Sequence, residues 1–148
     1  MNGGNPDPLE RAIVMAVQAH AGQRDDDGSP YILHPLRVMA GLQKPATPEQ
    51  RMAAVLHDTL EQTALTRADL LAAGIPAEVV EAVEILTRPE TESRLSATRR
   101  AAQNPIARAV KRADILDNMD LSRIPAAQPE DHARMQEYRA ALALLEAL

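Results

Sequence analysis

The sequence predicts an all-α protein, a compact bundle of about seven or eight helices. Apolar residues recur at intervals of three and four along much of the chain, as at Leu9, Ile13, Ala16 and Val17, and this is the period of an amphipathic helix. Several such segments open with a capping Asp, Thr or Asn followed directly by proline, a common start for a helix. We find no strand-period segment of useful length, no glycine-rich phosphate loop and no internal repeat. The apolar residues are mainly aliphatic, with no Phe or Trp, which suits helix-on-helix packing.

The composition favours one domain over residues 1–148, a common size for a single core. The chain has no cysteine, so it has no disulfide or thiolate site, which fits a cytoplasmic protein. Because the N-terminus lacks a signal-peptide pattern and no apolar run reaches membrane-span length, we expect a soluble protein without a membrane partner. A net charge of -5 argues against nonspecific nucleic-acid binding. The arginines between 94 and 112 form either a solvated helical face or a local basic surface.

The first third of the chain contains two predicted helices. Residues 1–7 should form a flexible tail, and the capping aspartate with the proline that follows it predicts a helix over residues 8–21. A short helix is expected from Pro35 to Leu42, with His34 at the edge of its N-cap. A histidine in that place is either a local hydrogen-bonding residue or a metal ligand.

Residues 22–31 are too polar and too rich in glycine and proline to form a helix, so we expect a loop. The loop carries consecutive aspartates at positions 25–27. These carboxylates are either a solvated loop tip or an acidic rim over a site that holds cations.

Thr47, Pro48 and Glu49 open a predicted helix that runs on through His57 and Asp58. The apolar run just before this pair packs against the core, so at least one of the two must lie in or beside the core, where an unpaired charge costs several kcal/mol. A divalent metal would satisfy both, since imidazole nitrogen and carboxylate oxygen are metal ligands. The alternative is a hydrogen-bonded or exposed pair.

The same helix should carry Glu61. Residues 58 and 61 share a face of a continuous helix, whereas residue 57 lies about 100° round it. The C-terminal end of this helix should therefore face a polar cavity.

The sequence predicts several further helices in the middle of the chain. We expect short packing helices over 68–73 and 76–86, a loop at 88–91 and a polar helix over 92–103. A strongly periodic helix should then follow from Asn104 to about residue 119.

Three polar residues lie beside the apolar stripe of the predicted helix over residues 104–119. Asp114, Asp117 and Asn118 fall at positions i, i+3 and i+4, which places them close together on the helix surface. They are either ordinary surface polarity or a cluster of oxygen-bearing side chains.

A C-terminal packing helix is expected over residues 128–147. Its apolar stripe consists of Met135, Tyr138, Leu142 and Leu145. We expect His132, in the exposed first turn, to have no chemical role.

Four separated segments have the order and spacing of a known family. They are Ala19-His20-Ala21-Gly22-Gln23, the run from Gly28 to Leu36, Leu56-His57-Asp58 with Glu61 and Thr63, and Asn104-Pro105 leading to Lys111-Arg112-Ala113-Asp114 and Asn118-Met119. Together they resemble the HD-domain metal phosphohydrolases, and more closely the alarmone hydrolase branch: the hydrolase domain of RelA/SpoT-type enzymes and its small single-domain relatives, such as the metazoan SpoT homologue. The resemblance covers about residues 10 to 122.

The resemblance implies one divalent metal, usually Mn²⁺ in this branch. Its ligands would be His34, His57, Asp58 and Asp114. Two imidazoles and two carboxylates give a site that is neutral overall with a divalent ion and leaves positions open for water and a phosphate oxygen.

The resemblance also implies a reaction, the hydrolytic removal of the 3′-pyrophosphate from guanosine tetra- or pentaphosphate. Glu61 matches the general base or water-orienting carboxylate of the family. Asn118 matches a residue that contacts the ribose or a phosphate of the substrate.

Several positions depart from the family pattern. Asp25 and Asp26 occupy loop positions where the family usually has an Arg-Lys pair that holds the nucleotide, and two anions there should repel a phosphorylated substrate unless Arg24 or another basic residue substitutes. Gln62 stands in place of the second acid of a catalytic Glu-Asp pair and cannot accept a proton. Asp117 replaces a residue that is often histidine.

Two functions remain open from the sequence. The first is a manganese-dependent 3′-pyrophosphohydrolase acting on a guanosine alarmone, or on another nucleotide such as an adenosine alarmone or a nicotinamide dinucleotide phosphate. The second is a non-catalytic module of the same fold that binds a nucleotide or a partner protein and keeps the metal as structure. The sequence leaves the oligomeric state open.

Overall fold

The computed structural model describes residues 6–120 and 128–148, so most of the expected N-terminal tail lies outside the described residues. The described residues form nine helices and no strand, apart from an isolated bridge between Arg24 and Pro30, which confirms the all-α prediction. The helices are α1 (Pro8–Ala19), α2 (Leu33–Ala40), α3 (Pro48–Leu56), α4 (Thr59–Gln62), α5 (Arg67–Ala72), α6 (Ala77–Leu86), α7 (Arg94–Ala102), α8 (Pro105–Asn118) and α9 (Pro129–Ala147).

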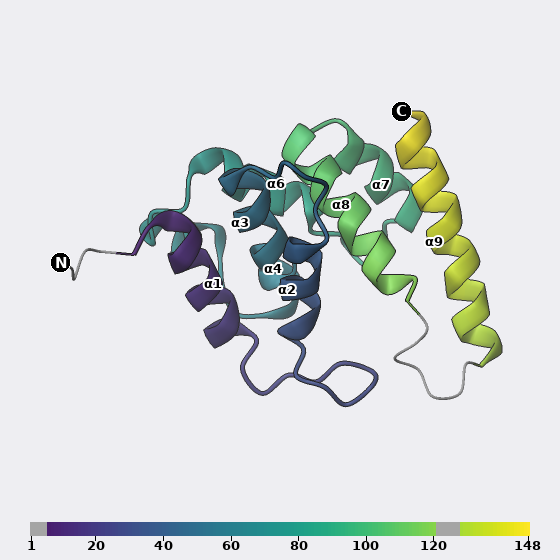
Figure 1. Cartoon of the computed structure of the whole chain (residues 1–148), viewed down its shortest axis with the longest axis horizontal. Coiled ribbons are helices and arrows are strands. Elements are labelled where there is room, and N and C mark those ends of the chain that lie inside the picture. The colour runs from purple at the N-terminus through teal and green to yellow at the C-terminus, as the bar shows by residue number, and fades with distance from the viewer. Residues whose placement is uncertain (1–5, 121–127) are drawn as a thin grey trace.

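Helix α3 lies at the centre of the bundle. It packs against α1, α2, α6 and α8, and α9 covers α7 and α8 on the outer side (Figure 1). The residues from Met52 to Leu56 are consequently almost inaccessible to solvent. A smaller apolar cluster, made of Ile115, Ala141 and Leu145, joins α8 to α9. This arrangement brings α2, the end of α3 and α8 side by side, and these are the three places that carry the predicted ligands.

Capping side chains begin the helices where the sequence predicts them. Asp7, Thr47 and Thr66 each accept a hydrogen bond from the backbone three residues later, and a side chain there bonds back to the cap. Such a cap stabilises a helix by about 1 kcal/mol. The side chain of Asn104 caps α8 by accepting two backbone N–H groups, those of Ile106 and Ala107. In α9 the predicted stripe is buried or half-buried and His132 is exposed.

The prediction of one continuous helix through His57 and Asp58 was wrong, because α3 ends at Leu56 and α4 begins at Thr59. The imidazole of His57 bonds the carbonyl of Ala54 at 2.6 Å, and the hydroxyl of Thr59 donates to the carbonyl of Leu56 at 2.8 Å. These side chains take carbonyls that a continuing helix would need. The angle of about 100° expected between residues 57 and 58 therefore does not apply, and both can point into one site.

His34 also lies slightly differently from the expectation. The N-cap of α2 is Ile32, and His34 sits inside the first turn of the helix. The side chain is almost fully buried, with 5% of the residue exposed.

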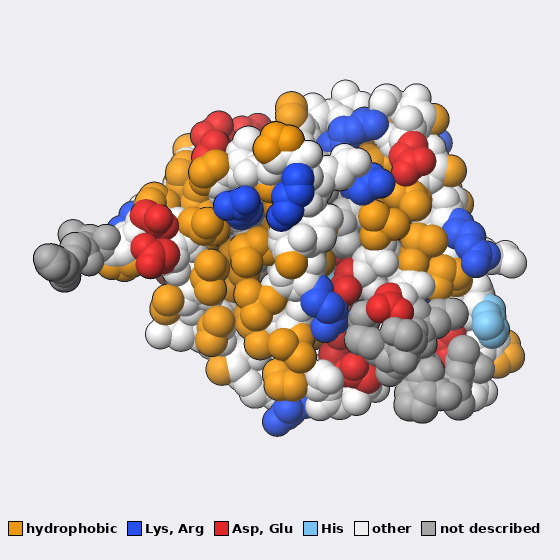
Figure 2. Space-filling view, viewed as in Figure 1, with side chains coloured by type: hydrophobic (Ala, Val, Ile, Leu, Met, Phe, Trp, Pro, Cys, Tyr) orange, Lys and Arg blue, Asp and Glu red, His pale blue; other side chains and the backbone are white. Residues whose placement is uncertain are grey.

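Figure 2 shows where side chains of each type gather on one face of the molecule. On the face shown in Figure 2, apolar side chains gather on the side of α1 and α3, and acidic ones gather near the lower ends of α2 and α8. Among the described residues, no helix combines the length and apolar character that crossing a membrane requires.

Candidate metal centre

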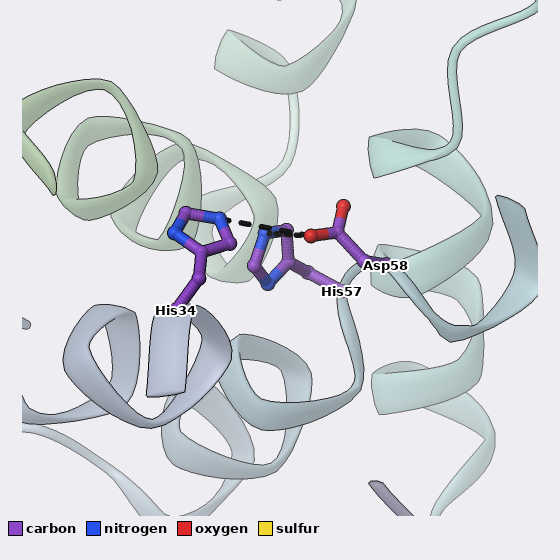
Figure 3. Close-up of side chains that lie close together, drawn as sticks. All are labelled: His34, His57 and Asp58. Carbon is purple, nitrogen blue, oxygen red and sulfur yellow. Dashed lines mark ion pairs between the residues drawn. The ribbon is translucent and has the colours of Figure 1, made fainter. Parts of the chain in front are cut away.

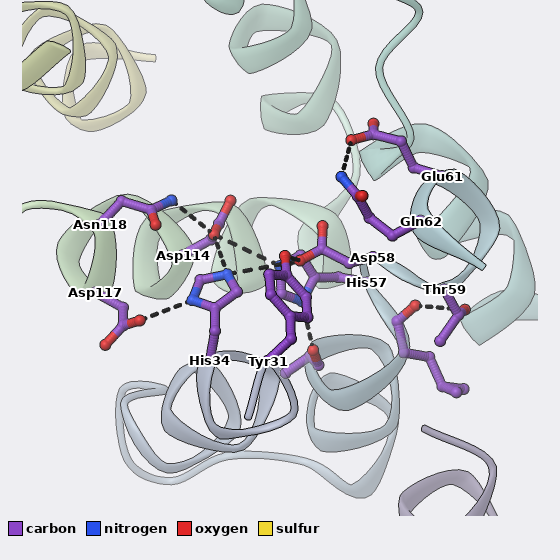
Figure 4. A network of polar contacts seen from close by, with 12 residues as sticks. Tyr31, His34, His57, Asp58, Thr59, Glu61, Gln62, Asp114, Asp117 and Asn118 are labelled. Carbon is purple, nitrogen blue, oxygen red and sulfur yellow. Dashed lines mark hydrogen bonds and ion pairs between the residues drawn. The ribbon is translucent and has the colours of Figure 1, made fainter. Parts of the chain in front are cut away.

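The four predicted ligand residues come together between α2, the α3–α4 junction and α8. One ligand atom from each of His34, His57 and Asp58 lies within 4.8 Å of the others (Figure 3). Asp114 joins them from α8, with its Oδ1 3.1 Å from Nε2 of His34 and 3.5 Å from Nε2 of His57 (Figure 4). The group is assembled from three elements that are far apart in the sequence.

Hydrogen bonds orient both imidazole rings the same way. The Nδ1–H of His57 donates to the carbonyl of Ala54, which can only accept, so the Nε2 of this ring is left without a proton in the neutral form. The Nδ1 of His34 lies 2.7 Å from Oδ2 of Asp117. Each ring therefore presents Nε2 to the centre, which is the arrangement typical of metal-ligating histidines.

The Nε2 atom of His57 shows that the donor set fits a cation. It is buried and has no hydrogen-bond partner, although carboxylate oxygens of Asp58 and Asp114 lie 3.1 and 3.5 Å away. A buried polar atom without a partner costs about 1–3 kcal/mol. A divalent ion among two imidazole nitrogens and two carboxylates would supply that partner and balance the charge.

The charges of the centre also favour a bound cation. Burial alone would lower the pKa of His57, but the carboxylates of Asp58 and Asp114 raise it well above 6.5. For His34, burial is likewise outweighed by hydrogen bonds to Asp114 and Asp117, which raise the pKa to about 9. Burial would raise the pKa of Asp58 and Asp114, but the nearby His57 lowers both below their usual range. Without metal the histidines therefore hold protons that neutralise the carboxylates, and a metal must displace these protons.

Metal affinity should consequently rise with pH. At pH 7 the metal-free His34 is mostly protonated, because its pKa is about 9, so each displaced proton should change the apparent affinity by about tenfold per pH unit below that value. The stability of the metal-free protein changes with pH in the opposite direction. The stability that His34 contributes is fully present below its unfolded pKa of about 6.5 and is lost as pH rises toward 9. Manganese titrations followed by EPR between pH 6.5 and 8.5 measure the pH dependence of the metal affinity. An affinity independent of pH would show that the metal displaces no proton from these histidines.

Tyr31 is a site residue to which the sequence assigned no role. Its hydroxyl donates to Oδ2 of Asp58 at 2.6 Å, and burial together with Asp58 raises its pKa, so it remains a donor. Tyr31 lies within the Gly28–Leu36 segment, one of the four that carry the family resemblance. The sequence of this segment does not reveal the contact, because Asp58 is 27 positions away.

A cavity of about 330 Å³ opens onto the centre. Glu61, Gln62 and Asn118 line it, as do Asp25 and Asp26 of the loop. Arg24 is exposed and does not line it. The cations that line the cavity within the described part of the chain are Arg88, Arg94, Lys111 and Arg134.

Glu61 and Gln62 lie beyond Asp58 on the α4 side of the network (Figure 4). Glu61 accepts the backbone N–H of Arg88 through Oε1 at 3.0 Å, and the amide of Gln62 donates to Oε2 at 3.3 Å. Both carboxylate oxygens of Glu61 are therefore held in place at the rim of the cavity.

The loop aspartates face cations. Asp25 lies 3.7 Å from a guanidinium nitrogen of Arg37, and Asp26 lies 3.7 Å from one of Arg134 on α9. Asn118 donates to Oδ1 of Asp114 at 3.1 Å. The negative charge of the loop is thus partly offset, and α9 contributes to the cavity wall through residues that the sequence did not indicate.

The all-α bundle brings two buried histidines and two partly buried aspartates together beside a polar cavity, an arrangement that can hold a metal ion. The model of the HD domain family matches residues 12–123, so the chain belongs to the HD domain family.

Several relatives share part of this sequence. The chain is 40% identical over 83 residues to the bifunctional (p)ppGpp synthase/hydrolase SpoT of Escherichia coli K12, covering 54% of this chain and 12% of SpoT. It is 32% identical over 107 residues to a GTP pyrophosphokinase of Myxococcus xanthus, covering 68% of this chain and 14% of that protein. The chain thus spans only a small part of the length of these relatives.

The fold is also similar to a solved structure. A metazoan ortholog of SpoT, described as hydrolysing ppGpp, superposes with a TM-score of 0.75 at 22% identity. The match covers 97% of this chain and 88% of that one, so the likeness extends over the whole bundle.

Proposed function

We propose that this protein is a metal-dependent phosphohydrolase that releases pyrophosphate from a nucleotide 3′-pyrophosphate. The observation that carries the proposal is the convergence of His34, His57, Asp58 and Asp114 beside a cavity whose lining combines carboxylates with four cationic side chains. The similarity to SpoT, whose name includes (p)ppGpp hydrolysis, supports a guanosine tetra- or pentaphosphate as substrate.

The four residues would hold one divalent ion, and Mn²⁺ is the ion we expect. The two carboxylates suit manganese, and the resemblance to the alarmone hydrolase branch is what favours this ion over other divalent metals. The chemistry that such an ion supplies when bound is a water of lowered pKa and stabilisation of negative charge on phosphorus. Tyr31 would fix the carboxylate of Asp58 for this task through its 2.6 Å hydrogen bond.

Glu61 would orient the attacking water and accept its proton. Its two oxygens are held by the N–H of Arg88 and the amide of Gln62, so the carboxylate is positioned in advance of substrate binding. Gln62 would serve as a positioning residue, because an amide donates a hydrogen bond but takes no proton.

The cavity cations would bind the phosphates. In the reaction a bond forms between the water oxygen and the phosphorus attached to the ribose 3′-oxygen. The bond between that phosphorus and the 3′-oxygen breaks, which gives pyrophosphate and, after the 3′-oxygen takes up a proton, a 3′-hydroxyl. Lys111 is almost fully buried, with Nζ 3.9 Å from Oδ2 of Asp114. It would therefore lie close to charge that develops on the transferred group. Asn118 would contact the ribose or a phosphate.

The negative charge of the loop aspartates would influence which nucleotide binds. Asp25 and Asp26 face Arg37 and Arg134 at 3.7 Å. Arg37 also bonds Asp117 and Arg134 also bonds Asp131, so these two cations offset the loop charge only in part. Arg134 would share its charge between these aspartates and a substrate phosphate. An adenosine alarmone or a nicotinamide dinucleotide phosphate therefore remains a candidate substrate beside the guanosine alarmones. We place the reaction in the cytoplasm, where these nucleotides occur.

One observation favours a second candidate, a non-catalytic module that binds a nucleotide or a partner protein around a structural metal. It is Gln62, which stands where the resemblance places a second catalytic acid.

The deciding experiment measures pyrophosphate release from a panel of guanosine and adenosine 3′-pyrophosphates in the presence of Mn²⁺, with phosphate release from a nicotinamide dinucleotide phosphate as a further arm. We expect turnover of at least one compound by the wild type and none by Asp58→Ala. Manganese binding without turnover of any compound would contradict the hydrolase and support the binding module. Failure to bind manganese would contradict both.

A further inference from the structure

A second carboxylate reaches His34 from the side opposite the cavity. Asp117 lies one turn after Asp114 on α8, and its Oδ2 is 2.7 Å from Nδ1 of His34. Asp114 approaches Nε2 of the same ring at 3.1 Å. Figure 4 shows the imidazole between these two side chains of α8. Residues three apart share a helix face, so two carboxylates on one face of α8 contact the two ring nitrogens of His34.

The carboxylate of Asp117 is itself held at both oxygens. Its Oδ2 is hydrogen-bonded to Nδ1 of His34, and its Oδ1 accepts a hydrogen bond from Nε of Arg37 at 2.8 Å. Arg37 comes from α2, one turn after His34. Only 11% of the Asp117 side chain is exposed, against 31% of Arg37. The guanidinium therefore restricts the rotation of the carboxylate and offsets its charge.

The other histidine is held differently. The Nδ1–H of His57 donates to the backbone carbonyl of Ala54, which is a neutral acceptor. A carboxylate behind an imidazole orients the ring and makes its opposite nitrogen a stronger ligand. The two rings are thus unequal, and His34 has the arrangement that strengthens a metal bond.

We propose that Asp117, fixed by Arg37, is a positioning residue that orients His34 and strengthens metal binding at the centre. Asp117 does not itself ligate the metal. The inference rests on the metal centre of the proposed function and is independent of the substrate. The arrangement departs from the family pattern, because the sequence resemblance places a residue that is often histidine at this position.

A purely structural role predicts something different. If the Arg37–Asp117 pair only clamped α2 to α8, its loss would lower the melting temperature of the metal-free protein and leave the metal affinity of the folded protein unchanged. Metal affinity measured without substrate therefore separates the two roles, and it does not depend on whether any nucleotide is hydrolysed.

The experiment compares Mn²⁺ dissociation constants, from the EPR signal of free Mn²⁺, for the full chain and its variants. We expect Asp117→Ala to weaken binding by about 10–100-fold, the usual effect of losing such an outer partner. Asp117→Asn should lie between this variant and the wild type, because its amide oxygen can still accept the Nδ1–H bond without the charge. Arg37→Gln should weaken binding less than Asp117→Ala. The matched control is Arg67→Gln, which breaks the exposed pair between Arg67 and Glu84 and should leave the affinity unchanged.

Two results would overturn the proposal. One is an affinity of Asp117→Ala within about threefold of the wild type, well below the usual range. The other is an Asp117→Asn variant as weak as Asp117→Ala, since a retained acceptor would then give no rescue. If the alanine variant does not fold, the near-isosteric Asp117→Asn decides alone, and an unchanged affinity overturns the proposal. Melting temperatures of the metal-free proteins identify which variants fold.

Discussion

Replacing Asp58 by alanine should abolish manganese binding and reduce turnover to the background rate. Oδ2 of Asp58 lies 3.1 Å from Nε2 of His57 and 3.6 Å from Nε2 of His34, so this oxygen is central to the group. Its loss should lower the affinity by more than the roughly 10–100-fold typical of an outer partner. Manganese EPR and pyrophosphate release measure the two effects.

The fold should survive this change. Asp58 lies between α3 and α4, outside the main apolar cluster, so the helical circular dichroism of Asp58→Ala should match the wild type. Asp58→Asn removes the charge with almost no change in shape, and it should lose metal as well. A folded Asp58→Ala variant that binds manganese as tightly as the wild type would remove Asp58 from the ligand set.

Replacing Glu61 by glutamine should remove most of the turnover and leave manganese bound. General base catalysis contributes about 10²–10⁴-fold, so kcat should fall by about that factor. The amide of a glutamine can still accept the N–H of Arg88 that Oε1 accepts at 3.0 Å, and Glu61 is exposed at the cavity rim. The metal affinity and the melting temperature should therefore stay as they are.

A matched change at an exposed glutamate elsewhere provides the control. Glu81 lies on the outer face of α6 and does not line the cavity, so Glu81→Gln should retain full activity. Undiminished kcat in Glu61→Gln would exclude Glu61 from the mechanism. Loss of manganese from that variant would instead place Glu61 in the ligand set.

Most of the fold was predictable because it depends on local signals. Caps such as Asp7, Thr47 and Asn104 define where helices begin, and the apolar period defines which face is buried. The break at His57 was not predictable in this way. It arises because the side chains of His57 and Thr59 bond carbonyls of α3, and the sequence pattern around them is that of a continuing helix.

The proposed ligands were predictable as a set through the order and spacing of four motifs. Their neighbours were not, since those contacts depend on tertiary packing. Tyr31 reaches Asp58 across 27 positions of sequence, and Asp117 reaches His34 across 83. Arg134 comes to the cavity on α9, beyond the part of the chain that the resemblance covers.

Charge was the hardest property to infer from sequence. Consecutive aspartates in the loop suggested repulsion of a phosphorylated substrate, but in the structure Asp25 faces Arg37 and Asp26 faces Arg134. Local counting of charge misses such pairs, because the partners come from α2 and α9. The electrostatics of the cavity therefore depend on how the helices are placed.

An anomalous difference map from a crystal of the protein loaded with Mn²⁺ tests the metal centre directly. We expect one strong peak between α2, the α3–α4 junction and α8, bound by His34, His57, Asp58 and Asp114. A manganese-loaded crystal with no peak at this position, or with a peak that some of these four residues do not ligate, would contradict the proposed metal centre.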